Sequence, residues 1–441
     1  MTGLMAGLRL RELGAEVVVL EADRVPGGMI RTVRHDGWLL ETGASTVTDT
    51  PGLRALLAAA GPLPAMVQPR PESQRRFLVH HGRVVAVPAS SAELVSTPLL
   101  SLAGRMRFLK EPFVPRGNPA PEESVAAFAR RRFGEEGAAR FFDPLVSGTT
   151  GGDPEQLLAR YTFPVEVEYE RRAGSVLKGR MRAARTARRE GQPRSELTPW
   201  SCGAGLEALP RHVAASLGSA FRAGIRVTRV TVTAAAAEVG DASGGRYQVD
   251  GVVVALPAPV LGQVTIEAPG SDALAGVSSM PHASLVVVAT GYRRDQVTHP
   301  LDGHGVLAAS SERRRILGVV FSSSQFPERA PAGHVLLTVS LGGGRHPAVA
   351  SLDDTDVMRL VREELGELLG ASGEPVTSEI RRWPAALPLA VAGHAERLAG
   401  ADGIEAANNR LVFAGPWRDG LMLRDVMQGG VAAADRLMQR L

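Results

Sequence analysis

Two glycine-containing segments near the start of the sequence have the spacing to bind a dinucleotide. The first begins at Gly3, continues with apolar residues at helical spacing to Gly14, and leads into the β-branched run AEVVVLEAD (15–23). In the motif G-x-G-x-x-G, Gly3 would be the third glycine, which lets a helix pack closely on a strand. Glu21, at the end of the run, could accept hydrogen bonds from a ribose. Alone, this half-motif is also typical of an ordinary helix–strand pair.

The second segment, VPGGMIRTVRHDGWLLETGAST (25–46), strengthens the dinucleotide interpretation. Adjacent Gly27 and Gly28 let backbone N–H groups approach a pyrophosphate, and Arg31 can add positive charge beside the phosphates. Gly43 is a further glycine in the same segment. The alternative is a pair of unrelated turns in a β-meander.

The elements that would position these residues are spread along the chain. A glycine turn opens an amphipathic helix at 203–218, and short apolar strands follow at 225–232 and 249–261. Near the C-terminus an apolar strand ends at Ala414-Gly415. A final helix then starts at about Leu423, and its free N–H groups could face an electron-rich ligand.

This pattern predicts an α/β and α+β fold with three parts. We expect a Rossmann-like domain whose first strand is truncated in this sequence, a substrate domain built on a mixed sheet, and a mostly helical insertion. The predicted boundaries are 1–70, 195–257 and 395–441 for the Rossmann-like domain, 258–394 with about 71–86 for the substrate domain, and 87–194 for the insertion.

Composition excludes several classes of protein. Of 441 residues, 44% are hydrophobic and 22% are charged, as in folded proteins and unlike disordered ones. The single cysteine, Cys202, excludes internal disulfides and cysteine-rich metal sites and suits a reducing compartment. No apolar run approaches the ~20 residues of a membrane-spanning helix, and the start of the chain lacks a secretory signal. The adjacent His80 and His81 fit a surface turn better than a ligand pair, so no metal is expected.

Positive charge is concentrated in one stretch. Eight arginine and lysine residues and no acidic residue lie between Arg171 and Arg189, in a chain of net charge +4. Three interpretations are open: a solvated helix face, a contact with anionic lipid, and a nucleic-acid patch. No nucleic-acid module and no set of stacking aromatic residues accompanies the stretch, so no nucleic-acid partner is expected.

Four long runs resemble sequences of one family, the oxygen-dependent, FAD-containing protoporphyrinogen and coproporphyrinogen oxidases, within the amine-oxidase-like flavoproteins. The runs are ESVAAFARRRFGEEGAARFFDPLVSGTTGGDPEQL (123–157), GYRRDQVTHPLDGHGVL (291–307), RRRILGVVFSSSQFPERAP (313–331) and RRWPAALPLAVAGH (381–394). The resemblance implies that the Rossmann-like domain binds FAD. It also implies that family members begin with a strand that is missing here, so this chain is expected to bind FAD poorly.

The resemblance implies a reaction as well. A member of this family removes six electrons and six protons from protoporphyrinogen IX in haem biosynthesis, and FAD passes the electron pairs to O2, giving H2O2. Oxidation of coproporphyrinogen III and a non-catalytic porphyrin-binding paralogue stay open. An amine oxidase or a carotenoid desaturase would share the flavin motifs but not the run at 291–307. Because protons can depart to water, no catalytic side chain is assigned.

Site residues carried over from the family fall into two groups. For the flavin, Val230 would contact the adenine through its backbone, and Trp383 is either a flavin neighbour or a core residue. Near the isoalloxazine ring we expect the residues that open the final helix. The full flavin set is Gly3, Glu21, Gly27, Gly28, Arg31, Gly43, Val230, Trp383, Gly415, Met422 and Leu423.

In the substrate pocket, Gly148 would bring its carbonyl near the macrocycle and Leu307 would sandwich a pyrrole ring. His304 departs from the family, which usually has phenylalanine there. It could stack on the macrocycle, interact with a propionate when protonated, or be a turn histidine. A second departure is Ala92-Glu93, which stands where eukaryotic relatives use an arginine to hold a propionate. The anchoring residue must therefore lie elsewhere.

Membrane contact is a further trait of the family. The segment 93–109 mixes leucines with Arg105 and Arg107, and could lie at a membrane interface beside the basic stretch 171–189. The alternative is a helix in the insertion's own core. We expect a cytoplasmic protein at the inner face of the membrane, and a homodimer.

Overall fold

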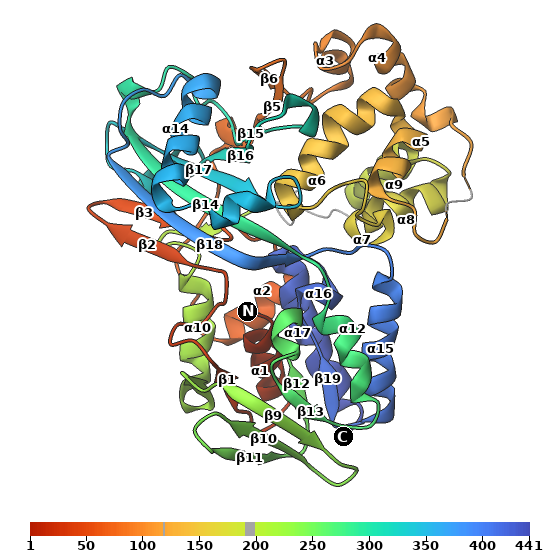
Figure 1. Ribbon diagram of the computed structural model, residues 1–441. Coiled ribbons are helices and arrows are strands. Elements are labelled where there is room, and N and C mark those ends of the chain that lie inside the picture. The colour runs from red at the N-terminus through yellow and green to blue at the C-terminus, as the bar shows by residue number, and fades with distance from the viewer. Residues whose placement is uncertain (118–119, 190–198) are drawn as a thin grey trace.

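The structure is a computed structural model that describes residues 1–117, 120–189 and 199–441. Figure 1 shows two lobes: a lower one that holds both termini and short strands, and an upper one with a long twisted sheet beside a group of helices. Each lobe combines residues from distant parts of the sequence.

The lower lobe contains the elements predicted to bind the dinucleotide (Figure 1). Its elements are α1 (Thr2–Glu12), β1 (Val19–Glu21), α2 (Pro51–Ala59), β4 (Met66–Val67), β7 (Ser201–Cys202), α10 (Ala208–Leu217), β8 (Phe221–Ala223), β9 (Val227–Val232), β10 (Ala237–Asp241), β11 (Arg246–Val249), β12 (Val252–Val254), α11 (Ala258–Leu261), β13 (Thr265–Glu267), α12 (Leu274–Ser278), α15 (His394–Ala407), β19 (Leu411–Phe413), α16 (Pro416–Asp419) and α17 (Leu423–Met438). β1 pairs with β8 and β12 pairs with β19, both in parallel, as in Rossmann-like domains.

Glycine lets α1 approach its neighbours closely. A Cβ added to Gly7 would lie 2.5 Å from Val19 Cγ2 of β1, and one added to Gly430 of α17 would overlap the carbonyl oxygen of Thr2. The G-x-G-x-x-G motif assigns the helix–strand contact to Gly3. In the structure Gly3 faces Ala255 instead, and Gly7, one helical turn further along, makes the close contact.

The core of the lower lobe extends beyond the predicted boundary at residue 258. Ala258, Leu274 and Met280 are buried in one cluster with Val230 of β9 and Phe413 of β19. Residues 258–280 therefore belong physically to the lower lobe, and the chain enters the upper lobe only with β14. The sequence did not predict this, because residues 258–280 form short helices, one short strand and turns, and such a segment carries no pattern that shows which lobe will bury its side chains.

The upper lobe is built on a seven-stranded mixed sheet in the order β18-β14-β17-β16-β15-β5-β6. Its elements are β5 (Arg76–His80), β6 (Arg83–Ala86), β14 (His282–Arg293), β15 (Gly305–Leu307), β16 (Ile316–Phe321), α13 (Ser322–Gln325), β17 (His334–Gly342), α14 (Asp354–Leu369) and β18 (Thr377–Pro388). Alternate residues of each strand face α14. Val286, Val319, Val339 and Leu341 on that face are at most 1% exposed, so this side is a closed core.

A two-stranded hairpin, β2 (Thr32–His35) and β3 (Trp38–Glu41), reaches from the lower lobe to the sheet. Trp38 and Leu40 pack on Ala289 of β14 and Leu336 of β17, on the face opposite α14. Gly291 provides the space, because a Cβ there would overlap the Trp38 ring.

The helical insertion lies beside the sheet (Figure 1). Its helices are α3 (Ser91–Ser96), α4 (Leu102–Leu109), α5 (Val125–Gly137), α6 (Asp143–Thr150), α7 (Ala159–Thr162), α8 (Pro164–Ala173) and α9 (Val176–Arg189), with a π-helical turn at Ala138–Phe142 between α5 and α6. Across the described ranges, no helix combines the length and the apolar character needed to cross a bilayer.

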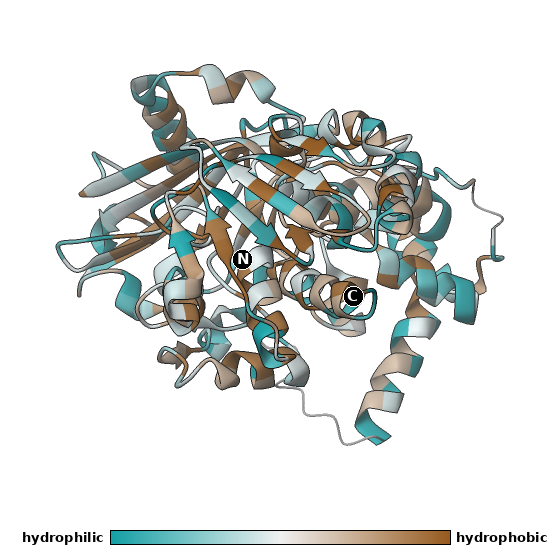
Figure 2. Cartoon of the chain, turned by 90° about the horizontal axis from the view of Figure 1, so that it is seen from below, coloured by the Kyte–Doolittle hydropathy of each residue, from teal (hydrophilic) through white to brown (hydrophobic). Residues whose placement is uncertain are grey.

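A buried ion pair fixes the base of α9. Arg132 Nε donates to Glu111 Oε1 at 2.8 Å, and both side chains are fully buried. Glu111 also accepts from the N–H groups of Val176 and Leu177 at the amino end of α9, where a carboxylate satisfies free donors. From this base α9 projects away from the body of the molecule (Figure 2).

Candidate active site

The amino end of α1 lies close to two predicted nucleotide-binding residues. Burial lowers the pKa of the Met1 α-amino group to about 6, with the charge of Glu21 raising it and that of Arg31 lowering it further. Glu21 ends β1, and its Oε1 accepts a hydrogen bond from the N–H of Asp23 at 3.0 Å. Gly3 lies in the first turn of α1, two residues from Met1, on whose amino group the charges of Glu21 and Arg31 act.

Gly27 and Gly28 form a turn with φ angles of +115° and +62°, a conformation that favours glycine. A Cβ on Gly27 would also lie 2.7 Å from Pro210. Arg31 is tied to the same turn, and Asp23 lies 3.3 Å from its Nη2. Its guanidinium donates at 3.1–3.2 Å to three carbonyl oxygens, those of Pro26, Ile30 and Val25. A cation held over a glycine turn suits a diphosphate.

Gly43 lies where the backbone passes Met29. A Cβ on Gly43 would overlap the carbonyl oxygen of Met29, so no other residue fits without movement. The N–H of neighbouring Thr42 donates to Arg31 O at 3.0 Å, and its carbonyl accepts from Trp383 Nε1 at 2.7 Å. Trp383, half-buried on β18, therefore connects the upper lobe to the predicted flavin segment.

A buried ion pair that sequence reasoning missed holds the same segment. Arg329 Nη2 lies 3.4 Å from Glu41 Oε1 and donates to the carbonyl of Ser45 at 3.0 Å. Glu41 also accepts from Leu206 N at 2.8 Å and Thr32 Oγ1 at 2.7 Å. Burial raises the pKa of Glu41 and lowers that of Arg329, while their mutual attraction opposes both shifts. The partners are 288 residues apart, and the sequence carried no signal of the pairing.

The loop between β19 and α17 carries the last group of predicted flavin residues. The N–H of Gly415 donates to Asp419 Oδ2 at 2.7 Å, and α16 packs against β18, the strand of Trp383. Met422 precedes α17 with 50% of its surface exposed, and Leu423 opens the helix. The amino end of α17 thus offers free N–H groups next to an exposed apolar side chain, which suits the edge and face of a flavin ring.

Val230 lies in the middle of β9, paired with Val239 of β10 and Ile266 of β13. Its side chain is buried in a cluster against which Leu20 of β1 packs, next to Glu21. This places Val230 near the predicted ribose-binding end of β1. Its backbone contact to an adenine stays a prediction.

One face of the seven-stranded sheet is half open. On the side opposite α14, two rows of directly paired residues run across the central strands, Gly305–Val320–Thr338 and Leu307–Gly318–Ser340. Val320, Thr338, Leu307 and Ser340 are half-exposed, in contrast to their fully buried neighbours on the α14 face. We call this surface the slot. Its floor combines the apolar Val320 and Leu307 with two small polar residues, Thr338 and Ser340, and with glycine at the centre.

The slot is closed at its two ends by different parts of the chain. The β2–β3 hairpin covers one end through Trp38 and Leu40. Helix α6 covers the other, because a Cβ on Gly148 would lie 2.5 Å from Leu307 and one on Gly151 would lie 3.0 Å from Leu285. The predicted substrate residues Gly148 and Leu307 are therefore in contact.

Two glycines and a salt bridge position Leu307. A Cβ on Gly318 would lie 2.7 Å from Leu307 Cδ2, so Gly148 and Gly318 hold the side chain from two sides. The α6 end of the contact is fixed by Asp143, whose carboxylate pairs with Arg345 and accepts from Ser310 N at 2.7 Å. Arg345 also donates to Ala308 O at 2.7 Å, next to Leu307.

His304 precedes β15 at the border of the slot. Its N–H donates to Arg75 O at 2.7 Å, and its carbonyl accepts from Phe321 N at 2.9 Å. Burial, together with the charge of Arg76, lowers the pKa of the imidazole to about 4. Without a ligand the ring is therefore neutral at pH 7, which favours stacking over binding a propionate as a cation.

The residues present fit a bound FAD. Gly28 has nothing within 4 Å of the place where a Cβ would lie, so a ligand can approach its backbone, while Gly27 and Gly43 are packed against Pro210 and Met29. Arg31 offers a cation at the diphosphate end, and Met422 an exposed apolar surface at the ring end. Burial raises the pKa of the Cys202 thiol to about 11, so this neighbour is not a nucleophile.

Comparison with known proteins identifies the family to which the chain is similar. Residues 1–438 match the family of flavin-containing amine oxidoreductases. The chain is 29% identical over 470 residues to the mitochondrial protoporphyrinogen oxidase of Nicotiana tabacum, covering 100% of this chain and 93% of the relative. It is 25% identical over 460 residues to the coproporphyrinogen III oxidase of Bacillus subtilis, covering 99% and 96%.

Solved structures agree in fold. A crystal structure from Exiguobacterium sp. 255-15, described provisionally as a protoporphyrinogen oxidase, superposes with a TM-score of 0.81 at 21% identity, covering 100% of this chain and 97% of that one. Reduced UDP-galactopyranose mutase gives a TM-score of 0.74 at 17% identity, covering 99% and 92%.

The chain therefore belongs to the flavin-containing amine oxidoreductase family. This confirms the predicted fold class, the FAD cofactor and the assignment as an oxidoreductase. The full-length relatives also confirm the resemblance to protoporphyrinogen and coproporphyrinogen oxidases. Individual contacts to FAD and substrate stay predictions.

Proposed function

We propose that this chain oxidises protoporphyrinogen IX to protoporphyrin IX in haem biosynthesis, with FAD as cofactor and O2 as electron acceptor. The observation that carries this proposal is the slot. Its floor of mostly small side chains suits a flat macrocycle, and it lies between α6 and the hairpin that leads into Gly43. The full-length relatives named for porphyrinogen oxidation support the same substrate class.

In the proposed reaction, FAD accepts the electrons and the protein positions the substrate. Bound FAD supplies a two-electron acceptor, so three rounds remove the six electrons of the reaction. Leu307, held between Gly148 and Gly318, orients the macrocycle, and α6 and the β2–β3 hairpin limit its position along the strands. The neutral His304 at the slot's border is available for stacking. Protons released from pyrrole N–H groups depart to water, which requires no positioned base.

The test uses purified protein loaded with FAD and mixed in air with protoporphyrinogen IX or coproporphyrinogen III. We expect porphyrin fluorescence to appear with three H2O2 per porphyrin, and kcat/KM to be higher for protoporphyrinogen IX. A higher value for coproporphyrinogen III selects that substrate. Porphyrin binding without turnover selects the non-catalytic paralogue, and H2O2 from amines alone contradicts the proposal.

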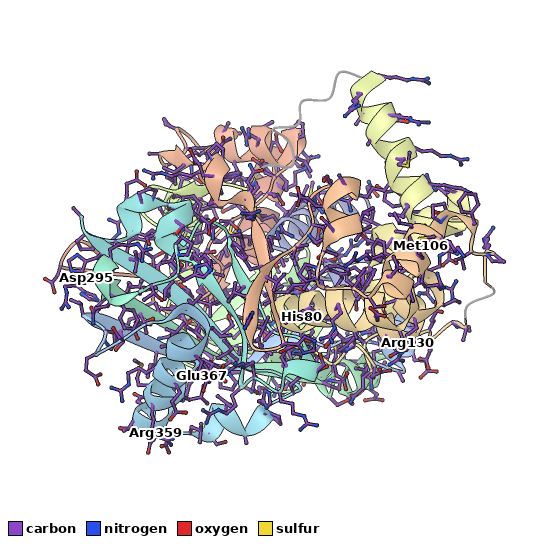
Figure 3. All side chains as sticks on the ribbon, turned by 90° about the horizontal axis from the view of Figure 1, so that it is seen from above. His80, Met106, Arg130, Asp295, Arg359 and Glu367 are labelled. Carbon is purple, nitrogen blue, oxygen red and sulfur yellow. The ribbon has the colours of Figure 1, made fainter. Side chains whose placement is uncertain are left out.

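We also propose that the insertion contacts an anionic membrane surface. Among the residues that the structure describes, seven of the eleven exposed large hydrophobic side chains lie in the insertion: Val95, Leu102, Met106, Leu109, Phe113, Val165 and Met181. Beside them α9 carries Lys178 and five exposed arginines. Figure 3 shows α9 standing clear of the body with its long side chains extended. Apolar side chains flanked by cations are the composition that binds at an anionic lipid interface.

The segment 93–109 contains both buried and exposed leucines, so one part of it suits the insertion's core and another part suits a membrane contact. Leu99 and Leu100 are 2% exposed and belong to the insertion's interior, whereas Leu102 is 73% exposed. Sedimentation with anionic vesicles should remove the protein from solution at low salt and less of it at high salt. Changing Leu102 and Met106 to glutamine should weaken binding at both salt concentrations. Equal binding to neutral vesicles would contradict the electrostatic part.

A cytoplasmic location at the inner face of the membrane is part of the same proposal. It is supported by the free, buried thiol of Cys202, which suits a reducing compartment. A homodimer stays a prediction, which light scattering of the FAD-loaded protein would check.

A further inference from the structure

Helix α6 ends beside the slot in one of two arrangements that helices commonly use. Gly151 follows the helix in the left-handed conformation, with φ +65°, and its N–H donates to Ser147 O at 2.9 Å. This single bond to the carbonyl four residues earlier is the αL ending. In the alternative, the Schellman ending, Gly151 N would donate to Gly148 O and Gly152 N to Ser147 O. The choice between the two endings decides whether the Gly148 carbonyl has a partner.

Thr150 favours the αL ending, because its side chain takes the N–H group that the Schellman ending needs. Its Oγ1 accepts from Gly152 N at 3.0 Å and donates to Val146 O at 2.8 Å. Thr150 is only 5% exposed, so water has little access to these bonds. Gly152 N is therefore not available to Ser147 O, and Gly151 N stays bonded to Ser147 O.

The Gly148 carbonyl is left without a donor at the slot. Among the described residues, no backbone N–H and no side chain donates to Gly148 O. Both glycines at this end of α6 face the slot floor, Gly148 at Leu307 and Gly151 at Leu285. The free carbonyl groups at the end of a helix carry the negative end of its dipole. The end of α6 is therefore a hydrogen-bond acceptor at the edge of the slot.

A porphyrinogen brings the matching donors. Its meso carbons are tetrahedral, so its pyrrole N–H groups can turn out of the macrocycle towards an acceptor. In the oxidised porphyrin the ring is conjugated and planar, and its remaining N–H groups lie in the ring plane and point inward. An acceptor at the end of α6 therefore favours binding of the substrate over binding of the product.

We propose that Thr150 is a positioning residue for the substrate: by holding Gly152 N, it keeps the Gly148 carbonyl free to accept a hydrogen bond from a pyrrole N–H. This rests on the proposed function, since it takes a porphyrinogen as the ligand. The resemblance to the family places the Gly148 carbonyl near the macrocycle. It does not say which side chain keeps this carbonyl unpaired, and that side chain is Thr150.

The adjacent threonine provides a matched control. Thr149 Oγ1 donates to Leu145 O at 2.6 Å, as Thr150 Oγ1 does to Val146 O, but Gly152 N donates to Thr150 alone. Thr149→Val and Thr150→Val thus remove the same hydroxyl group from neighbouring positions of one helix, and only Thr150→Val releases Gly152 N. Thr150→Ala removes the hydroxyl without putting a methyl group in its place, and Thr150→Ser keeps it.

The test measures kcat/KM for protoporphyrinogen IX and the dissociation constant of oxidised protoporphyrin IX, each with FAD-loaded protein. Thr150→Val and Thr150→Ala should lower kcat/KM about threefold to tenfold, the range for one hydrogen bond, and should keep the wild-type affinity for the porphyrin. Thr150→Ser and Thr149→Val should match the wild type in both measurements. Equal losses in Thr150→Val and Thr149→Val, or a porphyrin affinity that falls together with kcat/KM, would overturn the proposal, because either result indicates a general distortion of α6.

Two further measurements separate this proposal from the proposed oxidation. If the wild type does not turn over, anaerobic titration with protoporphyrinogen IX gives a dissociation constant, and Thr150→Val should bind about threefold to tenfold more weakly than Thr149→Val. A crystal structure of Thr150→Val should show Gly151 N donating to Gly148 O. A variant structure in which Gly148 O stays unpaired overturns the role of Thr150 and leaves the oxidation intact.

Discussion

Arg329 Nη2 lies 3.4 Å from Glu41 Oε1, and the two side chains are only 4% and 2% exposed. Arg329 belongs to the upper lobe, in the short 3-10 turn Pro327–Arg329, and Glu41 ends β3 just before Gly43. The pair therefore joins the substrate sheet to the predicted flavin segment. Because both charges have left water, each depends on the other for compensation.

Removing one partner of the Arg329–Glu41 pair should destabilise the folded protein. Arg329→Met leaves the Glu41 carboxylate buried without its cation and should lower the free energy of unfolding by about 3–5 kcal/mol. The double variant Arg329→Met/Glu41→Gln should lose less than the sum of the single changes, since it leaves no unpaired charge. Urea unfolding followed by circular dichroism measures both.

A surface pair provides the control for that experiment. Arg359 and Asp356 on α14 are 2.6 Å apart but 55% and 42% exposed, and Figure 3 labels Arg359 at the outer edge of the molecule. Arg359→Met should leave the urea midpoint close to that of the wild type, because an exposed ion pair contributes little. Similar losses for Arg329→Met and Arg359→Met would show that burial of the Glu41 pair has no energetic consequence.

Gly43→Ala should abolish FAD retention. The added methyl group would overlap the carbonyl of Met29, and the backbone must move at the point predicted to approach the flavin. The ratio of flavin to protein absorbance, read after each protein is loaded with FAD and free FAD is removed, measures the effect. Gly203→Ala is the control, because its Cβ would meet no atom closer than 3.7 Å. A Gly43→Ala protein as yellow as the control would remove Gly43 from the cofactor site.

Gly148→Ala should impair turnover without affecting FAD content. Its methyl group would press on Leu307, and strain of about 1–3 kcal/mol at this contact corresponds to roughly tenfold to a hundredfold in kcat/KM for the porphyrinogen. Adding Leu307→Ala should recover part of the loss by restoring space. Gly52→Ala, in α2 with nothing within 4 Å, should be neutral. If the second change deepens the loss instead, the two residues do not act through their contact.

Stability should fall in acid because of His304. The pKa of this imidazole is about 4 when folded, against 6.5 when free, so only the unfolded chain gains the proton between these values. Its contribution is complete above pH 6.5 and is lost as the pH falls towards 4, by about 3 kcal/mol in all. His304→Phe should remove this share of the pH dependence, measured as urea unfolding at pH 7 and pH 4.5. Equal pH dependence in wild type and variant would show that folding does not lower the pKa of His304.

Local patterns in the sequence were enough for the nucleotide-binding half. Gly27-Gly28 with Arg31 and the β-branched run ending at Glu21 are short-range features, because a turn and a buried strand depend on adjacent residues. In the structure Arg31 donates to carbonyls of the segment that holds Gly27-Gly28, and Glu21 ends β1, while their contacts to FAD stay predictions. Within the motif, however, only the packed helix shows that Gly7 and not Gly3 contacts β1.

The predicted substrate-binding surface, the slot, could be located only in the tertiary structure. Alternation along β16 and β17 indicates that each strand has two faces, but not which face is closed by α14 and which stays half open. That choice depends on strand order and register, which pair residues such as Arg76 and Gly305 from distant parts of the chain. The Arg329–Glu41 pair has the same origin, since partners 288 residues apart meet only when the two lobes close on each other. Sequence determined the local geometry of glycine turns and strands because that geometry is set by neighbouring residues. The slot and the buried charges arose only from packing between distant segments.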